Sequence, residues 1–195
     1  MSPRTKEQFD EMKAKSRQAI MRSALELFTQ RGYHGTSVSM IAERAGVSTG
    51  LMYNYFKSKI ELLEEIVREG INVIEISVER IEEIRDPREK IAASVEMAFD
   101  IAEEDMHFWT LYFSTIMQPD IPEGVKNIFS NFIQNMFDWL ESVCGQLGYA
   151  NPRIEARILG AILDGVFLHH CFVGEDYPIE ELKNEIIKRY CGEEK

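Results

Sequence analysis

Residues 37–56 read SVSMIAERAGVSTGLMYNYF, and this stretch decides the fold. It holds two short segments with helical periodicity, about 38–45 and 49–56, which a single glycine, Gly46, separates. Ser37 and Ser48 precede these segments, and a serine hydroxyl in that position can accept a backbone N–H that lacks a partner within the helix. Two short helices joined by a tight glycine turn predict a helix-turn-helix.

Helical periodicity also runs through the sequence on both sides of this stretch. A first helix is expected over about 7–31, ending at Gly32, and a long helix over about 59–84, which Asp86-Pro87 ends. Five more helices are expected over about 88–104, 105–117, 122–147, 152–173 and 178–191. No run of alternating β-branched residues predicts a strand. The prediction is an all-α protein of about nine helices, with a three-helix domain in residues 1–57 and a larger helical domain in residues 58–195.

The net charge of −11 on the 195 residues is distributed unevenly. Residues 1–60 hold ten Lys or Arg and five Asp or Glu, a net charge of +5, so the remaining 135 residues carry −16. A basic end on an acidic remainder indicates that the first sixty residues meet a polyanion such as nucleic acid. On charge alone, an accidental bias is the alternative.

Several classes of protein are disfavoured by what the sequence lacks. The three cysteines, Cys144, Cys171 and Cys191, are widely spaced and form no CxxC motif, as is typical of reduced thiols in the cytoplasm. No apolar N-terminal stretch predicts a secretory signal, and the longest uncharged run, 106–119, is shorter than the ~18 apolar residues of a membrane span. There is no phosphate-binding glycine-rich loop, HExxH motif or Gly-x-Ser-x-Gly turn. We therefore expect a cytoplasmic protein without enzymatic activity, cofactor or membrane partner.

The second short helix of the helix-turn-helix divides its side chains between two faces. Val47, Met52 and Phe56 are expected to pack inward. Small, polar and aromatic side chains without a core role remain, and such side chains are suited to the major groove of DNA. They are Thr49, Gly50, Leu51, Tyr53 and Asn54. A plain helical corner with half-buried tyrosines is the alternative interpretation.

A more specific signal lies between Arg17 and Leu63. It consists of Ala24-Leu25-Glu26-Leu27-Phe28, Gly32-Tyr33, Thr36-Ser37, Ile41-Ala42, Ala45-Gly46-Val47-Ser48, Gly50, Tyr53, Tyr55-Phe56, Lys59 and Leu62. This combination, which covers about a quarter of the chain, resembles the tetracycline-repressor (TetR) family. Tyr55 stands where many members carry histidine, and a tyrosine can also donate to a phosphate.

The resemblance implies a homodimeric transcriptional repressor that binds a palindromic operator on double-stranded DNA and is released by a small ligand. It makes residues 1–57 the DNA-binding domain and residues 58–195 the ligand-binding and dimerisation domain. It implies that phosphates are contacted by Ser37, Ser48, Tyr53, Tyr55 and Lys59, and base edges by Thr49, Gly50 and Asn54. By its chemistry, Asn54 can read an adenine and Leu51 can touch a thymine methyl group. A helical carrier of an apolar molecule that binds no DNA is the alternative, and the basic N-terminal residues argue against it.

Aromatic and methionine side chains concentrate in residues 97–139 of the C-terminal domain. They either fill its core or line an apolar cavity for a small molecule, and the family resemblance favours the cavity. Few bases lie nearby, so the expected ligand is apolar and neutral or weakly charged. The expected lining residues are Phe99, Phe108, Trp109, Tyr112, Phe113, Met117, Phe129, Phe132, Met136, Trp139 and Phe167.

The helix expected over 152–173 is apolar nearly all round, which indicates that it is buried on more than one side. Its small residues Gly160, Ala161 and Gly165 allow a partner helix to approach closely. Together with the last helix, it predicts an isologous four-helix dimer interface. The residues expected there are Ile158, Ala161, Ile162, Gly165, Leu168, His169, Phe172, Leu182 and Ile186.

Asp164, His169 and His170 raise the question of a metal site on the same helix. Adjacent helical residues point ~100° apart, so the two histidines do not easily bind one ion within a single chain. Two copies across a dimer could do so. The favoured interpretation is that these side chains form hydrogen bonds at the interface and that no metal is bound.

Overall fold

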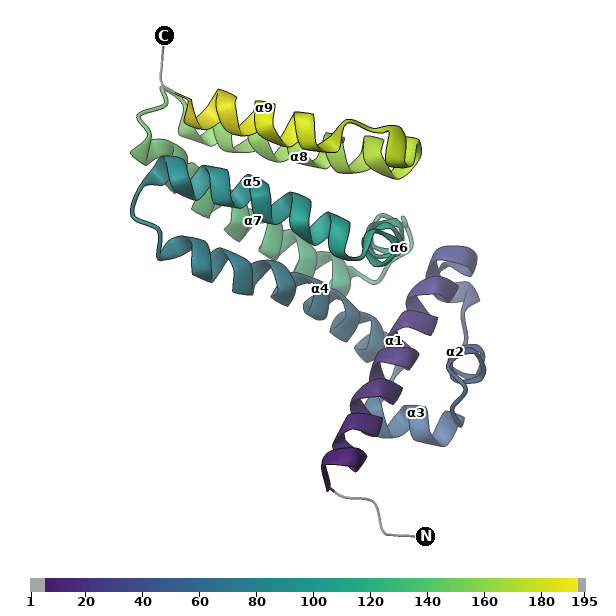
Figure 1. The fold of residues 1–195 in the computed structure, drawn as a ribbon. Coiled ribbons are helices and arrows are strands. Elements are labelled where there is room, and N and C mark those ends of the chain that lie inside the picture. Colours follow the sequence, from purple (N-terminus) through teal and green to yellow (C-terminus); the bar gives the residue numbers. More distant parts are fainter. Residues whose placement is uncertain (1–5, 193–195) are drawn as a thin grey trace. The chain divides into compact units, whose positions relative to one another are not determined.

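The computed structural model describes residues 6–192, and every regular element among them is helical (Figure 1). The α-helices in the described part of the chain are α1 (Lys6–Gly35), α2 (Val38–Arg44), α3 (Thr49–Tyr55), α4 (Lys59–Glu82), α5 (Pro87–Glu104), α6 (Met106–Ile116), α7 (Glu123–Gln146), α8 (Pro152–Val173) and α9 (Ile179–Cys191). A short 3-10 helix that the sequence did not predict, η1 (Gly174–Asp176), lies between α8 and α9. The prediction of an all-α protein is confirmed, with helix ends within a few residues of those expected.

Two serines begin the short helices, as predicted. Ser37 Oγ accepts the N–H of Met40 at 3.2 Å, and Ser48 Oγ accepts the N–H of Leu51 at 3.1 Å. Each bond pairs one of the backbone donors that a helix leaves unsatisfied at its first turn. The turn between α2 and α3 passes through Gly46, whose φ of 67° is a conformation that favours glycine.

The first helix is interrupted where the sequence predicted its end. Gly32 has φ 75° and ψ 162°, so the helical conformation breaks there and resumes for one short turn to Gly35. Thr36 stabilises this end of α1, because its hydroxyl lies 2.9 Å from the carbonyl oxygen of Gly32 and 3.1 Å from that of Leu27, and its one proton is shared between them. The break leaves backbone groups of α1 that other side chains must satisfy.

The described residues form two compact units. The head unit comprises residues 6–70 and 110–128, and the body unit comprises residues 71–109 and 129–192. Helices α4, α6 and α7 contribute residues to both units. These units differ from the functional domains expected at 1–57 and 58–195, and that functional boundary stays a prediction.

The core of the head unit forms where α1 packs against α2 and α2 packs against α3. Ile20 and Phe28 of α1 and Ile41 of α2 have no exposed surface, and Met52 and Phe56 are 1% exposed. Their inward orientation agrees with the helical spacing in the sequence. Val47, which was also expected to pack inward, is only partly buried.

The core of the body unit gathers apolar side chains from α5, α7, α8 and α9. Helix α5 packs against both α8 and α9, and α8 and α9 lie side by side (Figure 1). The buried members of this core are Ile91, Val95, Phe99, Leu140, Val143, Cys144, Ala156, Leu159, Val166 and Ile186.

Candidate nucleic-acid interface and ligand cavity

Helix α3 has one buried and one exposed face. Met52 lies on the buried face. Tyr53 is 50% exposed and Leu51 is 37% exposed, and Thr49, Gly50 and Asn54 are also exposed. All five residues expected to face a DNA groove are therefore exposed. Tyr55 is partly buried, with its ring 6.4 Å from that of Phe56.

Gly50 is not required by the packing of the protein. A Cβ atom at this position would have only Ser48 Oγ within 4 Å, at 4.0 Å. The backbone of α3 is consequently open at its N-terminal end. A base edge or a phosphate can approach the main chain at this point more closely than a side chain would allow.

Ser37 and Ser48 keep hydrogen-bonding capacity beyond their capping roles. Both are exposed, and each hydroxyl oxygen accepts a backbone N–H. A hydroxyl also has one proton to donate. Either serine can therefore cap its helix and donate to a phosphate at the same time.

Lys59 has a role inside the protein that the sequence did not reveal. Its ammonium group donates to the carbonyl oxygens of Tyr33 and Thr36, both at 2.7 Å, and lies 4.2 Å from the centre of the Tyr33 ring. Partial burial lowers the pKa of Lys59. An ammonium group has three protons, so one remains for the phosphate contact that the family resemblance implies.

Other bases of the N-terminal region are also engaged within the head unit. Arg17 donates to Glu65 and to Glu69, both at 2.8 Å, and its guanidinium lies 5.5 Å from the centre of the Phe56 ring. Arg44 donates to Glu26 at 2.6 Å. Glu26 is already counted in the net +5 of residues 1–60, but Glu65 and Glu69 are not, so the charge available to a polyanion is smaller than +5. Lys57, directly after α3, is exposed.

The end of α1 is joined to residues that follow α6. Gln118 Nε2 donates to the carbonyl oxygen of Phe28 at 2.8 Å, and its Oε1 accepts the N–H of Tyr33 at 3.3 Å. These groups lie on either side of the break at Gly32, so one carboxamide bridges it. Thr29 adds a second link, because its hydroxyl lies 3.1 Å from the hydroxyl of Thr115 and 3.3 Å from the carbonyl oxygen of Leu111.

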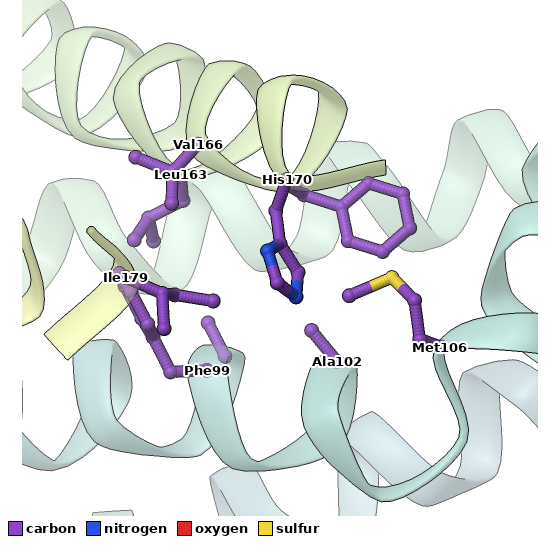
Figure 2. A pocket seen from close by; sticks show the side chains of 9 residues that line it. Phe99, Ala102, Met106, Leu163, Val166, His170 and Ile179 are labelled. Carbon is purple, nitrogen blue, oxygen red and sulfur yellow. The ribbon is translucent and has the colours of Figure 1, made fainter. Parts of the chain in front are cut away.

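A cavity of about 20 Å³ lies in the body unit (Figure 2). Its walls come from α5, α6, α8 and α9. Two of the predicted lining residues, Phe99 and Phe167, border it. The remaining walls, which the sequence analysis did not assign to a cavity, are Ala98, Ala102, Met106, Leu163, Val166, His170 and Ile179.

The other nine predicted lining residues do not border this cavity. Trp109, Tyr112 and Phe132 are buried, and Tyr112 donates its hydroxyl to the carbonyl oxygen of Val67 at 2.8 Å within the head unit. Burial raises the pKa of the Tyr112 hydroxyl. Met117 is 78% exposed. The partly buried members are Phe108, Phe113, Phe129, Met136 and Trp139.

His170 gives the cavity a polar atom. Its Nδ1 is buried and has no hydrogen-bond partner in the described part of the chain. Figure 2 shows the imidazole extending from α8 toward Ala102 and Met106. Helical spacing was the signal for this placement, since Leu163, Val166 and His170 follow one another at i, i+3 and i+7 on the same face.

Helix α8 carries an apolar stripe that its own chain leaves uncovered. Ile158, Leu168 and Phe172 are exposed, as are Ala161 and His169. The segment Pro152–Asp176 is long and apolar enough to cross a membrane by length and composition, although a single such helix is weak evidence for a membrane segment. Only 17% of its most apolar window is buried.

The remaining residues expected at a subunit interface are placed differently. Ile162, Gly165 and Leu182 are partly buried, and Ile186 belongs to the core of its own body unit. Gly160, also expected to admit a partner, instead lies against the Phe137 ring, which is 2.7 Å from where a Cβ atom would be.

The acid and the two histidines of α8 do not form a cluster. Asp164 is exposed. His169 Nδ1 lies 3.3 Å from the hydroxyl of Tyr177, while His170 points into the cavity. Within residues 6–192 there is no group of three or more His, Cys, Asp or Glu arranged to hold a metal ion.

Comparison with known proteins places this arrangement in context. The family model for bacterial regulatory proteins, tetR family, matches residues 20–66. The chain is 26% identical over 165 residues to the HTH-type transcriptional activator FasR of Mycolicibacterium smegmatis, covering 83% of this chain and 74% of that protein. This relative is a regulator of transcription rather than an enzyme.

Solved structures share the whole fold. The transcriptional regulator FadR from Bacillus subtilis, in complex with stearoyl-CoA, superposes with a TM-score of 0.71 at 22% identity, over 91% of this chain and 99% of that chain. AibR, in complex with isovaleryl coenzyme A and operator DNA, superposes with a TM-score of 0.70 at 19% identity, over 91% and 98%.

Proposed function

This chain belongs to the TetR family of bacterial regulatory proteins, and from that premise we propose that it represses transcription by binding a palindromic operator as a homodimer. The exposed face of α3 is the observation that supports DNA recognition most directly. Its hydrophobic anchor, Met52, fixes the helix, while Tyr53 and Asn54 on the other face are free of core packing. This is how a recognition helix is presented to the major groove.

The dimer is proposed to form through the apolar stripe of α8. Ile158, Ala161, Leu168 and Phe172 follow helical spacing along one exposed face. A second copy of this stripe would cover it by a two-fold arrangement in which the same residues meet. Burial in such an interface explains an apolar yet exposed helix without a membrane, so we place the protein in the cytoplasm.

The ligand is proposed to be an apolar molecule held in the body unit. The cavity walls are almost entirely apolar, and two proteins of the same fold have acyl-coenzyme A compounds bound. A ligand changes operator affinity only by its differential affinity for two states of the dimer. Helix α6 has residues at the cavity and residues at α1. Met106 borders the cavity, and Leu111 and Thr115 contact Thr29 of α1.

The test of DNA recognition begins by selecting duplexes that the full-length protein retains from a random pool. The selected duplex is then titrated with the wild type, Tyr53→Ala and Asn54→Ala at fixed salt. Asn127→Ala is the matched control, because Asn127 is equally exposed but lies on α7. We expect Asn54→Ala to weaken binding by about fivefold or more, the loss expected for a base contact, and the control to leave it unchanged.

Salt dependence separates the proposed regulator from a ligand carrier. Operator binding should weaken steeply as salt rises, because phosphate contacts release counterions. Failure to retain any duplex at low ionic strength would favour the carrier. Equal affinities of Asn54→Ala and Asn127→Ala would show that α3 is not the reading helix.

A further inference from the structure

The cavity of the body unit combines apolar walls with a single unsatisfied nitrogen. Phe99, Ala102, Val166 and Ile179 contribute hydrocarbon, and Met106 contributes a flexible thioether. His170 Nδ1 is buried and has no hydrogen-bond partner in residues 6–192. A buried polar atom without a partner is costly to the folded protein, so it calls for an explanation in terms of function.

Water matches this cavity poorly. Its volume of about 20 Å³ exceeds the ~10–15 Å³ that one water molecule needs, so it is the walls and not the size that disfavour water. A buried water is stable when it has two to four polar partners, and His170 is the one residue of the cavity wall with a polar side chain. An apolar molecule with one hydrogen-bonding atom fits the chemistry of the walls better.

The charge of the cavity walls indicates which kind of ligand atom could pair with His170. No lysine, arginine, aspartate or glutamate borders the cavity, and the sequence after residue 60 carries a net charge of −16. Among the residues of the cavity wall, a buried carboxylate would therefore depend on His170 alone for a counter-charge. A neutral carbonyl oxygen needs only one donor, which an imidazole supplies from Nδ1 when that nitrogen carries the proton.

We propose that His170 is the polar contact of the ligand site, and that its Nδ1–H donates to the carbonyl oxygen of a neutral acyl ester or thioester. The acyl chain would lie among the side chains of α5 and α8, with Met106 and its neighbours moving to enlarge the cavity. This inference rests on the proposed ligand response, and it adds the recognition chemistry of the site.

A matched pair of small molecules isolates the carbonyl group. S-octanoyl-N-acetylcysteamine is a neutral thioester, and S-octyl-N-acetylcysteamine differs from it only by a CH₂ in place of the C=O. Calorimetric titration of the full-length wild type should show a preference for the thioester of about threefold to tenfold, as expected for one hydrogen bond to a buried partner. Octanoate and octanoyl-CoA, titrated alongside, distinguish a free acid and a coenzyme A thioester as sources of the acyl group.

Variants of two histidines of the body unit assign the preference to a residue. His170→Leu should bind both probes with similar affinity, because the donor is gone. His107→Leu is the control, since His107 is exposed and lies outside the cavity wall, and it should keep the wild-type preference. In the absence of probe, His170→Leu should raise Tm by about 2 to 4 °C, because an unpaired buried nitrogen is removed.

Nitrogen NMR of the wild type keeps the proposal falsifiable even when His170→Leu does not fold. The Nδ1 resonance of His170 should shift with the thioester and stay in place with the thioether. Each of three results would overturn the proposal. The Nδ1 resonance of His170 stays in place with both probes, neither probe binds, or the wild type and His170→Leu prefer the thioester equally. A different result would refute the proposed ligand response and leave the His170 contact standing: the thioester binds through His170, but the affinity for the operator does not change.

Discussion

The ammonium group of Lys59 lies 2.7 Å from the carbonyl oxygen of Tyr33, so the first residue of α4 caps the end of α1. A second bond of the same length joins it to Thr36. Carbonyl groups at a helix C-terminus carry partial negative charge and lack partners within the helix. A lysine that a DNA contact would explain therefore also holds the helix-turn-helix together.

Replacing this lysine should cost stability as well as DNA affinity. Lys59→Met leaves the two carbonyl groups without their donor, and we expect the free energy of unfolding to fall by ~2 kcal/mol. Urea titration followed by circular dichroism measures this change. Lys57→Met is the control, because Lys57 is exposed and lies two residues before the start of α4. Full stability of Lys59→Met would mean that the capping bonds contribute nothing.

Gln118 should be as important to the head unit as a buried core residue. Gln118→Ala removes the donor to Phe28 and the acceptor for Tyr33 at once, so we expect a loss of ~1 to 3 kcal/mol in the free energy of unfolding. Gln118→Glu keeps the acceptor and loses the donor, so its free energy of unfolding should lie between those of the wild type and Gln118→Ala. Gln146→Ala, at an exposed position in α7, serves as the control. Urea titrations of the three variants give the comparison, and equal values for Gln118→Ala and Gln146→Ala would refute the bridging role.

Charge on the stripe of α8 should dissociate the proposed dimer. Ala161→Glu places a carboxylate on the exposed apolar face, where two copies would meet and repel. Sedimentation velocity should show a monomer, and operator affinity should fall because two heads no longer bind together. Met117→Glu introduces the same charge at an exposed residue that is not part of α8, and it should leave the dimer intact. A dimeric Ala161→Glu would place the interface elsewhere.

Acid should weaken the junction that Glu82 makes with α5 and α7. Its carboxylate accepts from Lys90 Nζ at 2.7 Å and from Trp139 Nε1, and the hydrogen bond from Lys90 is the main cause that lowers the pKa of Glu82. A carboxyl group with a lowered pKa in the folded state stabilises the protein above its unfolded pKa. That contribution is lost as pH falls through the folded value.

Thermal unfolding of Glu82→Gln tests this sign. The variant should be less stable than the wild type at neutral pH, and the difference should shrink below about pH 4, where the wild-type carboxyl group also becomes protonated. The effect is small, because the Glu82 side chain is half exposed. Glu79→Gln, at an exposed position on the same helix, should show no such pH dependence. A constant difference between wild type and Glu82→Gln across the pH range would contradict the prediction.

The sequence predicted the features that depend on neighbouring residues. Ser37 and Ser48 cap their helices, Gly32 breaks α1, and on α3 Met52 is buried while Tyr53 is exposed. All of these follow from spacings of a few residues, which backbone geometry fixes. Local patterns of this kind were sufficient for the fold and for the exposed face of α3.

Contacts between distant residues were beyond the reach of these patterns. Gln118 meets Phe28 across 90 positions of sequence, and no periodicity indicates that pairing. The aromatic cluster was assigned to one cavity, whereas Tyr112 and Met117 belong to the head unit and Phe99 to the body unit. Helical spacing shows that a side chain faces inward, but it does not show which helix it will meet.

The hydrogen bonds of Gln118 across the break at Gly32 have a consequence for fragments of this protein. A fragment ending at residue 57 would contain the whole of α3, the proposed recognition helix, yet it would lack both Lys59 and Gln118. The last turn of its first helix would then be exposed to solvent and prone to fraying. Transfer of the helix-turn-helix to another scaffold would therefore also require the residues around Gln118, which lie far away in the sequence.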